Sequence, residues 1–197
     1  MAKAPVAGQA KTRLVPALGA EGAAHLAARL LDHAMATARA AALGTVQLAC
    51  APDTTHPAFA AQTARGGVEL VDQGPGELGA RMQRAFARAF AAGAGRVILF
   101  GTDIPALDVV ALRAADRLLA AHDAVFAPTS DGGYGLIGLK VLEPTLFDDA
   151  AMPWSTDRVM ATTRERLVAA RLVHAELPLL HDIDEPADLR HLPASLR

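Results

Sequence analysis

The sequence predicts an α/β protein, a three-layer α/β/α sandwich built around a mostly parallel sheet. Short apolar runs alternate with longer stretches whose apolar residues recur at helical spacing, and such alternation is typical of right-handed βαβ crossovers. Glycines such as Gly19, Gly44 and Gly93 separate these stretches. The chain has 197 residues, 52% of them hydrophobic, which suffices for one sizeable core, so we expect a single domain over residues 1–197.

The first half of the chain sets up the alternation. Leu26, Leu30, Leu31 and Met35 share one helical face, and this spacing predicts a long helix over residues 20–43. The elements expected after it are a strand over 45–51, a short helix over 57–64, a strand over 68–72, a helix from Leu78 to near Gly93 and a buried strand over 96–100.

The second half continues the pattern around one tight turn. Apolar strands are expected over 124–127 and 134–139, on either side of the turn at residues 130–133. The remaining expected elements are helices over 111–121 and 157–170, a strand over 172–177 and a last short helix near Pro186.

Composition excludes several function classes. Nineteen Lys and Arg residues against 21 Asp and Glu give a net charge of -2, which offers no broad basic surface for a nucleic acid. No apolar run approaches the roughly 18 residues of a membrane span. The residues after Met1 lack the apolar core of a secretory signal, and the single Cys50 cannot form an internal disulfide, so we expect a cytoplasmic protein. We expect Cys50 to be a small buried apolar residue.

The segment of residues 3–13 is the first candidate site. In parallel sheets ligands bind beyond the carboxyl ends of the strands, and this segment leads from there towards a helix. Backbone amides near Gly8 can approach phosphate oxygens, while Lys11 and Arg13 supply positive charge. It is not a Walker loop, because Pro5 stands where that motif requires a glycine. A solvated basic turn explains the same charge pattern equally well.

Thr102 and Asp103 form the second candidate, directly after the strand expected over 96–100. A carboxylate at the end of a central strand can hold Mg²⁺ or Mn²⁺ against phosphate groups. The alternative is that Asp103 caps the following helix, but Asp108 lies nearer to the start of that helix. We therefore favour metal binding by Asp103.

Two further aspartate segments remain open between structural and ligand roles. Asp131 precedes Gly132 and Gly133, a pattern that suits a hairpin turn and also the close approach of a ligand to the backbone. Asp182 and Asp184 alternate with an isoleucine, so in an extended segment they share one face, where they complete a metal site or pair with Lys or Arg. The nearby acid Asp188 is read as an ordinary helix start.

Three further features of the sequence are weaker indications of a site. Residues 76–82 open a helix with Gly79 and can place backbone amides near a base or sugar, for which Gln73 is a candidate contact. The single Trp154 is read as core filler rather than as an acceptor platform. The seven histidines lack zinc-site spacing.

Six motifs occur in the order seen in one bacterial family: KAPVAGQAKTRL, GELGARM, GTDIPAL, DGGYGLIGL, PWST and DIDEPADL. The chain resembles the GT-A-fold transferases labelled radical-SAM/selenodomain-associated transferases, which are similar to molybdenum-cofactor and phospholactate guanylyltransferases. The resemblance implies a nucleotide-diphosphate pocket with Lys11 and Arg13 at the phosphates and Asp103 as the metal-binding acid. The resemblance also supports Asp131 and Asp184 as site residues, and leaves open which of them is the second metal ligand. Members of the family carry an apolar strand before the KAP segment, whereas only two residues precede Lys3 here, so the first strand is short or missing.

The predicted function is therefore a metal-dependent glycosyltransferase or nucleotidyltransferase. Its partners would be Mg²⁺ or Mn²⁺, a nucleotide or nucleotide-sugar donor and a small-molecule acceptor. Asp103 and Asp184 are the expected metal ligands, and Asp103 and Asp131 the expected catalytic residues, with Asp131 as an acceptor base. The residues expected at the nucleotide are Lys3, Pro5, Gly8, Lys11, Arg13, Gln73, Gly79 and Thr102. The alternative is a non-catalytic nucleotide-binding or partner protein of the same fold.

Overall fold

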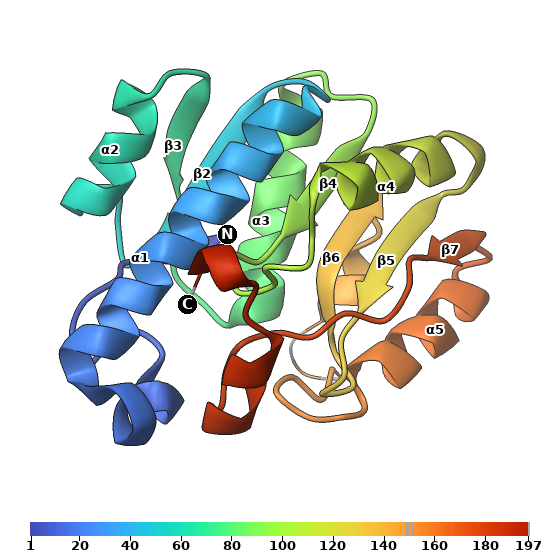
Figure 1. The fold of residues 1–197 in the computed structure, drawn as a ribbon. Coiled ribbons are helices and arrows are strands. Elements are labelled where there is room, and N and C mark those ends of the chain that lie inside the picture. The colour runs from blue at the N-terminus through green and yellow to red at the C-terminus, as the bar shows by residue number, and fades with distance from the viewer. Residues whose placement is uncertain (149, 151, 197) are drawn as a thin grey trace. The chain divides into compact units, whose positions relative to one another are not determined.

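The computed structural model describes residues 1–148, 150 and 152–196, and the chain folds into two compact units (Figure 1). Unit 1 comprises residues 1–72, 101–109 and 181–197, and unit 2 comprises residues 73–100 and 110–180. Each unit has its own sheet and helices, so the predicted α/β class is confirmed. The expectation of a single domain stays a prediction.

Unit 1 contains a parallel sheet of three strands. The central strand β2 (Val46–Ala51) pairs with β1 (Ala2–Lys3) on one side and with β3 (Val68–Asp72) on the other. Strand β1 has only two residues, and Ala2 lies opposite Cys50. The predicted short first strand is therefore confirmed. Because β1 ends level with β2, the segment after it starts at the carboxyl edge of this sheet.

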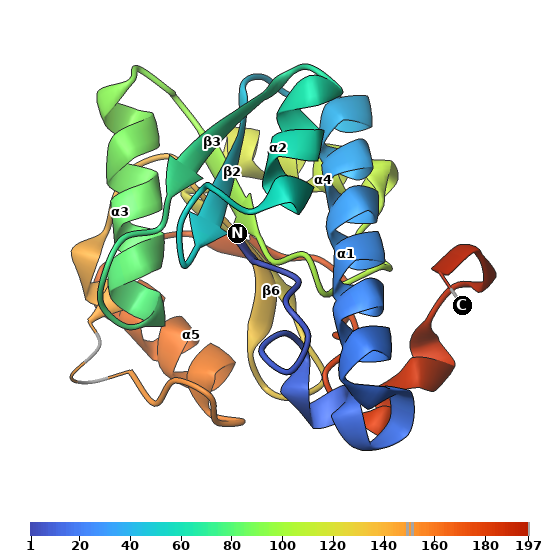
Figure 2. The ribbon, with the colours of Figure 1, turned by 90° about the vertical axis from the view of Figure 1, so that its left-hand side faces the viewer.

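Two helices pack on the sheet of unit 1, α1 (Val15–Ala41) and α2 (Pro57–Ala64) (Figure 2). The residues that join them to the strands form one apolar cluster: Ala2, Ala4, Leu31, Met35, Leu48, Cys50 and Phe59. Gly19, at φ 71° and ψ 166°, is not helical and kinks α1, so the predicted break before residue 20 is present. The helical residues that precede this kink, from Val15, were not predicted. The apolar face predicted from helical spacing is the buried face.

A second apolar cluster of unit 1 joins α1 to two short 3-10 segments. These are η1 (Thr12–Leu14) and η3 (Pro186–His191), with η4 (Ala194–Leu196) following. Leu14 and Ile183 are fully buried in this cluster. The short helix predicted near Pro186 is thus present in 3-10 form.

Unit 2 contains a mixed sheet in the order β4–β6–β5–β7. Its strands are β4 (Val97–Phe100), β5 (Ala124–Pro128), β6 (Tyr134–Leu139) and β7 (His174–Glu176). Strand β6 is antiparallel to both neighbours, whereas β7 is parallel to β5. The expectation of a mostly parallel sheet does not hold for β6, because a turn of residues 129–133 joins it to β5, and so short a connection permits only antiparallel pairing.

The helices of unit 2 are α3 (Leu78–Ala91), α4 (Val109–Ala121) and α5 (Val159–Ala169), with the 3-10 segment η2 (Pro144–Phe147). Gly138 of β6 leaves room for close packing, since a Cβ there would lie 3.1 Å from Leu119 Cδ2 of α4. Phe86 of α3 packs on Phe147 of η2, with ring centroids 5.5 Å apart. All the predicted helices and strands are present, with ends shifted by a few residues.

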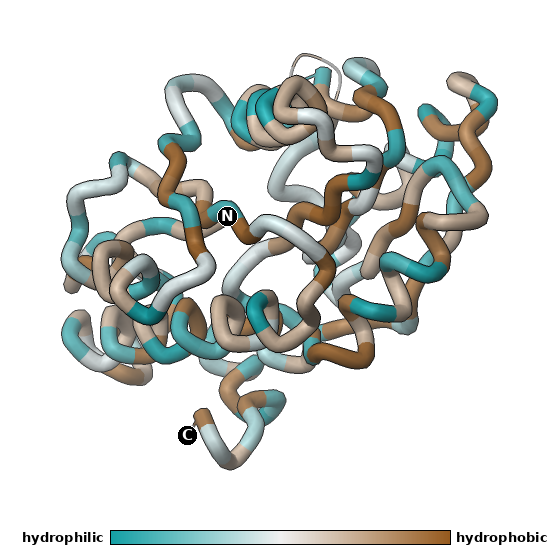
Figure 3. Tube along the Cα trace, turned by 90° about the horizontal axis from the view of Figure 1, so that it is seen from above, coloured by the Kyte–Doolittle hydropathy of each residue, from teal (hydrophilic) through white to brown (hydrophobic). Residues whose placement is uncertain are grey.

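The helices combine hydrophobic and hydrophilic residues along their length (Figure 3). In the described part of the chain, none of them is long and apolar enough to cross a bilayer.

Cys50 lies in the buried part of β2, and its thiol is fully covered. Burial raises the pKa of this thiol to about 11, so it stays protonated near neutral pH. The prediction that Cys50 is a small buried apolar residue is confirmed.

Candidate functional site

Three segments of unit 1 that are far apart in sequence bring one cation and two carboxylates together. The Lys11 ammonium donates hydrogen bonds to Asp103 Oδ2 at 3.2 Å and to Asp184 Oδ1 at 2.7 Å. Lys11 belongs to the first candidate loop, Asp103 to the segment after β4, and Asp184 to the segment before η3. The sequence predicted a site role for each of these three residues, and the structure places them in direct contact.

A buried apolar neighbour anchors each of the three segments. Leu14, three residues after Lys11, and Ile183, just before Asp184, lie in the same apolar cluster. Ile104, just after Asp103, is 5% exposed. The Ile183 backbone N–H also donates to the Asp103 carbonyl oxygen at 2.9 Å. Because neighbouring residues of an extended segment point to opposite faces, burying Ile183 directs Asp184 outward, towards Lys11.

Gly101 gives the Asp103 side chain its position. A Cβ at Gly101 would lie 2.6 Å from Asp103 Oδ1, closer than side chains tolerate. The carboxylate therefore folds back over the glycine and presents its other oxygen to Lys11. Thr102, between them, is half-buried. A side chain at position 101 would therefore force the Asp103 carboxylate to move.

Asp103 and Asp184 keep the Lys11 side chain in its charged form. Its side chain is only 12% exposed, and this burial alone would lower the pKa of the ammonium. The charges of Asp103 and Asp184, together with their hydrogen bonds, outweigh burial and raise the pKa of Lys11 above its ordinary value of 10.5. Both carboxylates keep more than a third of their side-chain surface exposed. They can therefore accept further ligands from solvent.

The loop before α1 holds Lys11 in an uncommon conformation. Lys11 adopts left-handed backbone angles, φ 47° and ψ 45°, which cost a residue with a side chain about 1 kcal/mol. Gly8 has φ 73° and is exposed, and apart from its two chain neighbours no described residue comes within 4 Å of the place where its Cβ would be. This open space at Gly8 suits the close approach of a ligand to the backbone.

The other predicted residues of this loop take different positions. Arg13 is 65% exposed, and its guanidinium lies 3.9 Å from Glu185 Oε1, a weak ion pair that leaves its donors accessible to an anion. Lys3 is exposed and donates from Nζ to the Gln9 carbonyl oxygen at 2.8 Å. Pro5 is half-buried between β1 and the loop. Arg13 is thus the cation of this loop best placed to join Lys11.

The pair Asp103 and Asp184 fits a divalent cation. Since both oxygens contact one nitrogen, they lie at most about 5.9 Å apart. Mg²⁺ binds oxygens at about 2.1 Å, so two of its ligand oxygens are at most about 4.2 Å apart, and a small movement of either exposed carboxylate closes the difference. Among the described residues there is no group of three or more His, Cys, Asp or Glu side chains able to hold a metal. Two carboxylates suffice where phosphate oxygens and water complete the shell, as Mg²⁺ prefers.

Three predicted site residues, Asp131, Gln73 and Gly79, belong to unit 2. Asp131 is exposed, and its Oδ1 accepts from Thr129 Oγ1 at 2.6 Å and from the Gly133 N–H at 3.0 Å. These bonds give Asp131 a structural role in its turn, as the hairpin reading of the sequence expects. Its assignment as an acceptor base stays a prediction.

Gln73 and Gly79 are both buried in unit 2. The Gln73 carbonyl oxygen accepts a hydrogen bond from the Arg84 guanidinium, which also donates to the Pro75 carbonyl oxygen at 2.9 Å. Gly79 lies in the first turn of α3. Their predicted roles at the base or sugar stay predictions.

The sequence allowed Asp184 to pair with a Lys or Arg, and the structure shows that pairing with Lys11. The pairing of Lys11 with Asp103 was missed, because Lys11 was assigned to phosphate groups alone. Sequence reasoning also missed Glu185 beside Arg13. One signal was available for Asp184, the alternation of acids with Ile183, whereas nothing local in the sequence ties Lys11 to a residue 173 positions away. Asp188 was read correctly, since its Oδ2 accepts from the backbone N–H groups of Asp184 and Glu185.

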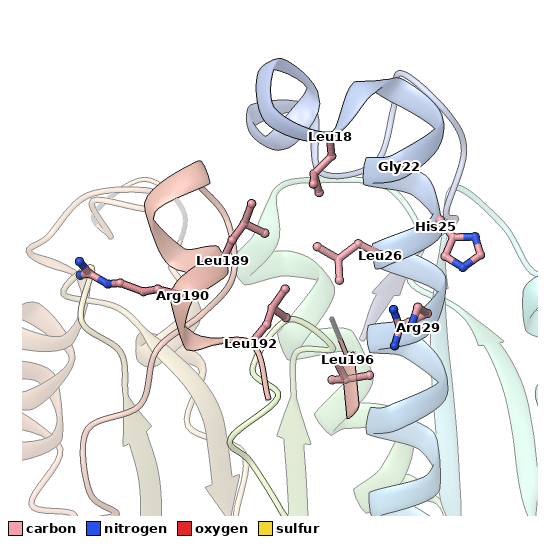
Figure 4. Close-up of a pocket in the computed structure, with 9 residues that line it drawn as sticks. All are labelled: Leu18, Gly22, His25, Leu26, Arg29, Leu189, Arg190, Leu192 and Leu196. Carbon is pink, nitrogen blue, oxygen red and sulfur yellow. The ribbon is translucent and has the colours of Figure 1, made fainter. Parts of the chain in front are cut away.

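Unit 1 also contains an apolar groove of about 700 Å³ between α1 and the C-terminal segment (Figure 4). Leu18 and Leu26 of α1 face Leu189, Leu192 and Leu196 across it. None of the predicted site residues lines this groove. The candidate chemistry therefore lies at the charged cluster and not in this apolar groove.

Comparisons with known proteins support this fold. A crystal structure described as "putative nucleotide-diphospho-sugar transferase from Desulfovibrio desulfuricans G20" is 31% identical, with a TM-score of 0.86, and the match covers 98% of this chain and 84% of that one. This likeness confirms the predicted nucleotide-diphospho-sugar transferase-like fold.

Rv0371c from Mycobacterium tuberculosis H37Rv shares the fold at 21% identity, with a TM-score of 0.53 and coverage of 82% of this chain and 81% of that one. A structure of Rv0371c in complex with manganese, also 21% identical, matches with a TM-score of 0.52 and covers 83% of this chain and 84% of that one. No curated protein matches the chain.

A family model matches residues 27–156, that is, about two thirds of the chain. Its description is "Uncharacterized protein conserved in bacteria (DUF2064)". Together with the D. desulfuricans structure, this match supports a transferase-like family, while the narrower radical-SAM/selenodomain label stays a prediction. The chain belongs to the DUF2064 family.

Proposed function

We propose that this protein is a metal-dependent transferase that takes a nucleotide sugar or a nucleoside triphosphate as donor and passes part of it to a small-molecule acceptor. The observation that carries the proposal is the convergence of Asp103 and Asp184 on a single cationic group, with Arg13 close to the residue after Asp184. The description of the D. desulfuricans protein and the manganese bound to Rv0371c support the same class of chemistry.

In this proposal some residues of unit 1 bind the metal and others bind the phosphate groups. Asp103 and Asp184 hold Mg²⁺ or Mn²⁺, and the bound metal supplies positive charge to the diphosphate of the donor. Lys11 and Arg13 bind the phosphate oxygens, Arg13 with a two-pronged guanidinium. The backbone around Gly8 approaches the diphosphate closely, because that loop has open space at the glycine. A nucleoside diphosphate leaves in glycosyl transfer, and pyrophosphate leaves in nucleotidyl transfer.

Thermal stability measured with a panel of nucleotides tests this proposal. UTP, GTP, CTP, UDP-sugars and GDP-sugars are each added with and without Mn²⁺. A matching donor at 100 times its dissociation constant should stabilise the protein by about 2.7 kcal/mol, and only when Mn²⁺ is present. Consumption of that donor on adding acceptor candidates supports the enzyme. Stabilisation without consumption supports the alternative, a non-catalytic nucleotide-binding protein.

Asp103→Asn is the decisive variant. It keeps the shape of the side chain but removes a negative charge, so the metal-dependent stabilisation should disappear while the fold is retained. Asp116→Asn is the matched control, because Asp116 belongs to unit 2, is not a predicted site residue and forms an ion pair of 3.1 Å with Arg96. An unchanged manganese response in Asp103→Asn would remove Asp103 from the site.

A further inference from the structure

We propose that Lys11 is a built-in competitor of the metal: its ammonium occupies the cation position between Asp103 and Asp184 until a nucleotide diphosphate draws it away, so metal and nucleotide bind together. This inference rests on the proposed function and adds to it a coupling between the binding of metal and of nucleotide. The geometry that points to it is the pair of contacts at 3.2 and 2.7 Å from Lys11 Nζ to the two expected metal ligands.

The position of the ammonium overlaps the position of the expected metal. A cation that binds Asp103 Oδ2 and Asp184 Oδ1 together lies between these two oxygens, where Lys11 Nζ is found. Two cations cannot share those oxygens at contact distance without strong repulsion. A divalent metal that uses both carboxylates must therefore displace Lys11.

Displacement is unfavourable unless Lys11 finds a new partner. Its side chain is 12% exposed, so the ammonium relies on the two carboxylates in place of water. A nucleotide diphosphate carries at least two negative charges and offers such a partner. The flexible four-carbon stem of lysine allows the ammonium to move from carboxylate to phosphate without backbone movement.

Charge balance also favours the binding of metal and nucleotide together. Lys11 with two carboxylates has a net charge of −1, and a divalent metal added to that group changes it to +1. A bound diphosphate reverses this excess of positive charge. Metal and nucleotide should thus increase each other's affinity, and by linkage the increase must be the same in both directions.

The test titrates Mn²⁺ alone, without any nucleotide, and follows free Mn²⁺ by electron paramagnetic resonance. Wild type is compared with Lys11→Met, which keeps the length of the stem but removes the charge. Lys140→Met is the matched control, because Lys140 is not a predicted site residue and its Nζ donates to the backbone carbonyl oxygen of Ala120 at 2.9 Å. Circular dichroism confirms folding, and Lys11→Arg keeps the charge in case Lys11→Met folds poorly.

We expect Lys11→Met to bind Mn²⁺ alone about tenfold more tightly than wild type. Lys140→Met and Lys11→Arg should stay within about twofold of wild type. In the presence of UDP or GDP, Lys11→Met should lose its higher affinity for Mn²⁺, because that variant lacks the contact between the lysine ammonium and the phosphate groups. Equal or weaker binding of Mn²⁺ alone by Lys11→Met would overturn the inference. Failure of wild type to bind any nucleotide with Mn²⁺ would instead reject the proposed function, while the titration with Mn²⁺ alone still decides the role of Lys11.

Discussion

Asp103 in unit 1 and Asp131 in unit 2 look alike in the sequence, but their contacts differ. Each follows a strand closely and has glycine nearby. Asp103 pairs with Lys11, which is 92 positions away, whereas Asp131 Oδ1 is used by Thr129 and Gly133 of its own turn. The comparison teaches that long-range partners, and not the local motif, separate a candidate ligand from a turn residue.

The glycines beside the two aspartates differ in the same way. A Cβ on Gly101 would meet only the Asp103 carboxylate, at the end of a movable side chain. A Cβ on Gly132 would run into the backbone of Asp157, and Gly132 also has φ 85°. Gly101 is thus tied to the position of a charged group, and Gly132 to the packing of unit 2.

The largest expected effect comes from alanine at these two glycines. Gly132→Ala should lower the free energy of unfolding by about 3 kcal/mol or more, because neither the backbone of Asp157 nor the positive φ can adapt cheaply. Gly101→Ala should change it by less than about 1 kcal/mol but weaken Mn²⁺-dependent nucleotide binding about tenfold, because Asp103 must turn away. Urea unfolding and nucleotide titrations measure both. The opposite pattern would contradict the distinction between the two turns.

The next effect separates Asp184 from Asp131 as the second metal ligand. Asp184→Asn should weaken Mn²⁺-dependent nucleotide binding about a hundredfold, since it removes a charged ligand. Asp131→Asn should leave Mn²⁺-dependent nucleotide binding within about threefold of wild type, because Asp131 Oδ1 accepts hydrogen bonds from Thr129 and Gly133 of its own turn. Isothermal titration with Mn²⁺ and nucleotide gives the two values. A larger loss in Asp131→Asn than in Asp184→Asn would reassign the ligand.

The smallest effect concerns alkaline pH. Lys11 has its pKa raised in the folded protein, so its ion pairs stabilise the fold fully below pH 10.5 and lose this contribution as pH rises through the raised pKa. The free energy of unfolding of wild type should therefore exceed that of Lys11→Met by up to about 1 kcal/mol near neutral pH. This difference should shrink only above pH 10.5. Urea unfolding from pH 8 to 11.5 follows the difference. A decline that begins near pH 8 would show that Lys11 does not hold its charge this way.

Much of the fold follows from local patterns in the sequence. The apolar spacing of Leu26, Leu30, Leu31 and Met35 identifies α1, because burial of one helical face is a local property. The antiparallel pairing of β6 with β5 agrees with the hairpin interpretation of the short turn at residues 130–133, whereas its pairing with β4 has no local signal in the sequence. The break at Gly19 was predicted, whereas the short helical stretch of residues 15–18 before it was not.

The candidate site was predictable only in part. Asp103 and Lys11 were predicted from their places at a strand end and in a cationic loop, and Asp184 from its alternation with Ile183. Their meeting depends on buried anchors, Leu14 and Ile183, that pack with each other in three dimensions. Such packing between distant segments leaves no local trace in the sequence.

A crystal structure of the protein with MnCl₂ and the nucleoside diphosphate that stabilises it best tests the central claim most directly. The anomalous signal of manganese should lie about 2.1 to 2.2 Å from carboxylate oxygens of Asp103 and Asp184, with Lys11 Nζ moved to a phosphate oxygen. Manganese bound elsewhere, with Lys11 still bridging the two aspartates, would contradict the account.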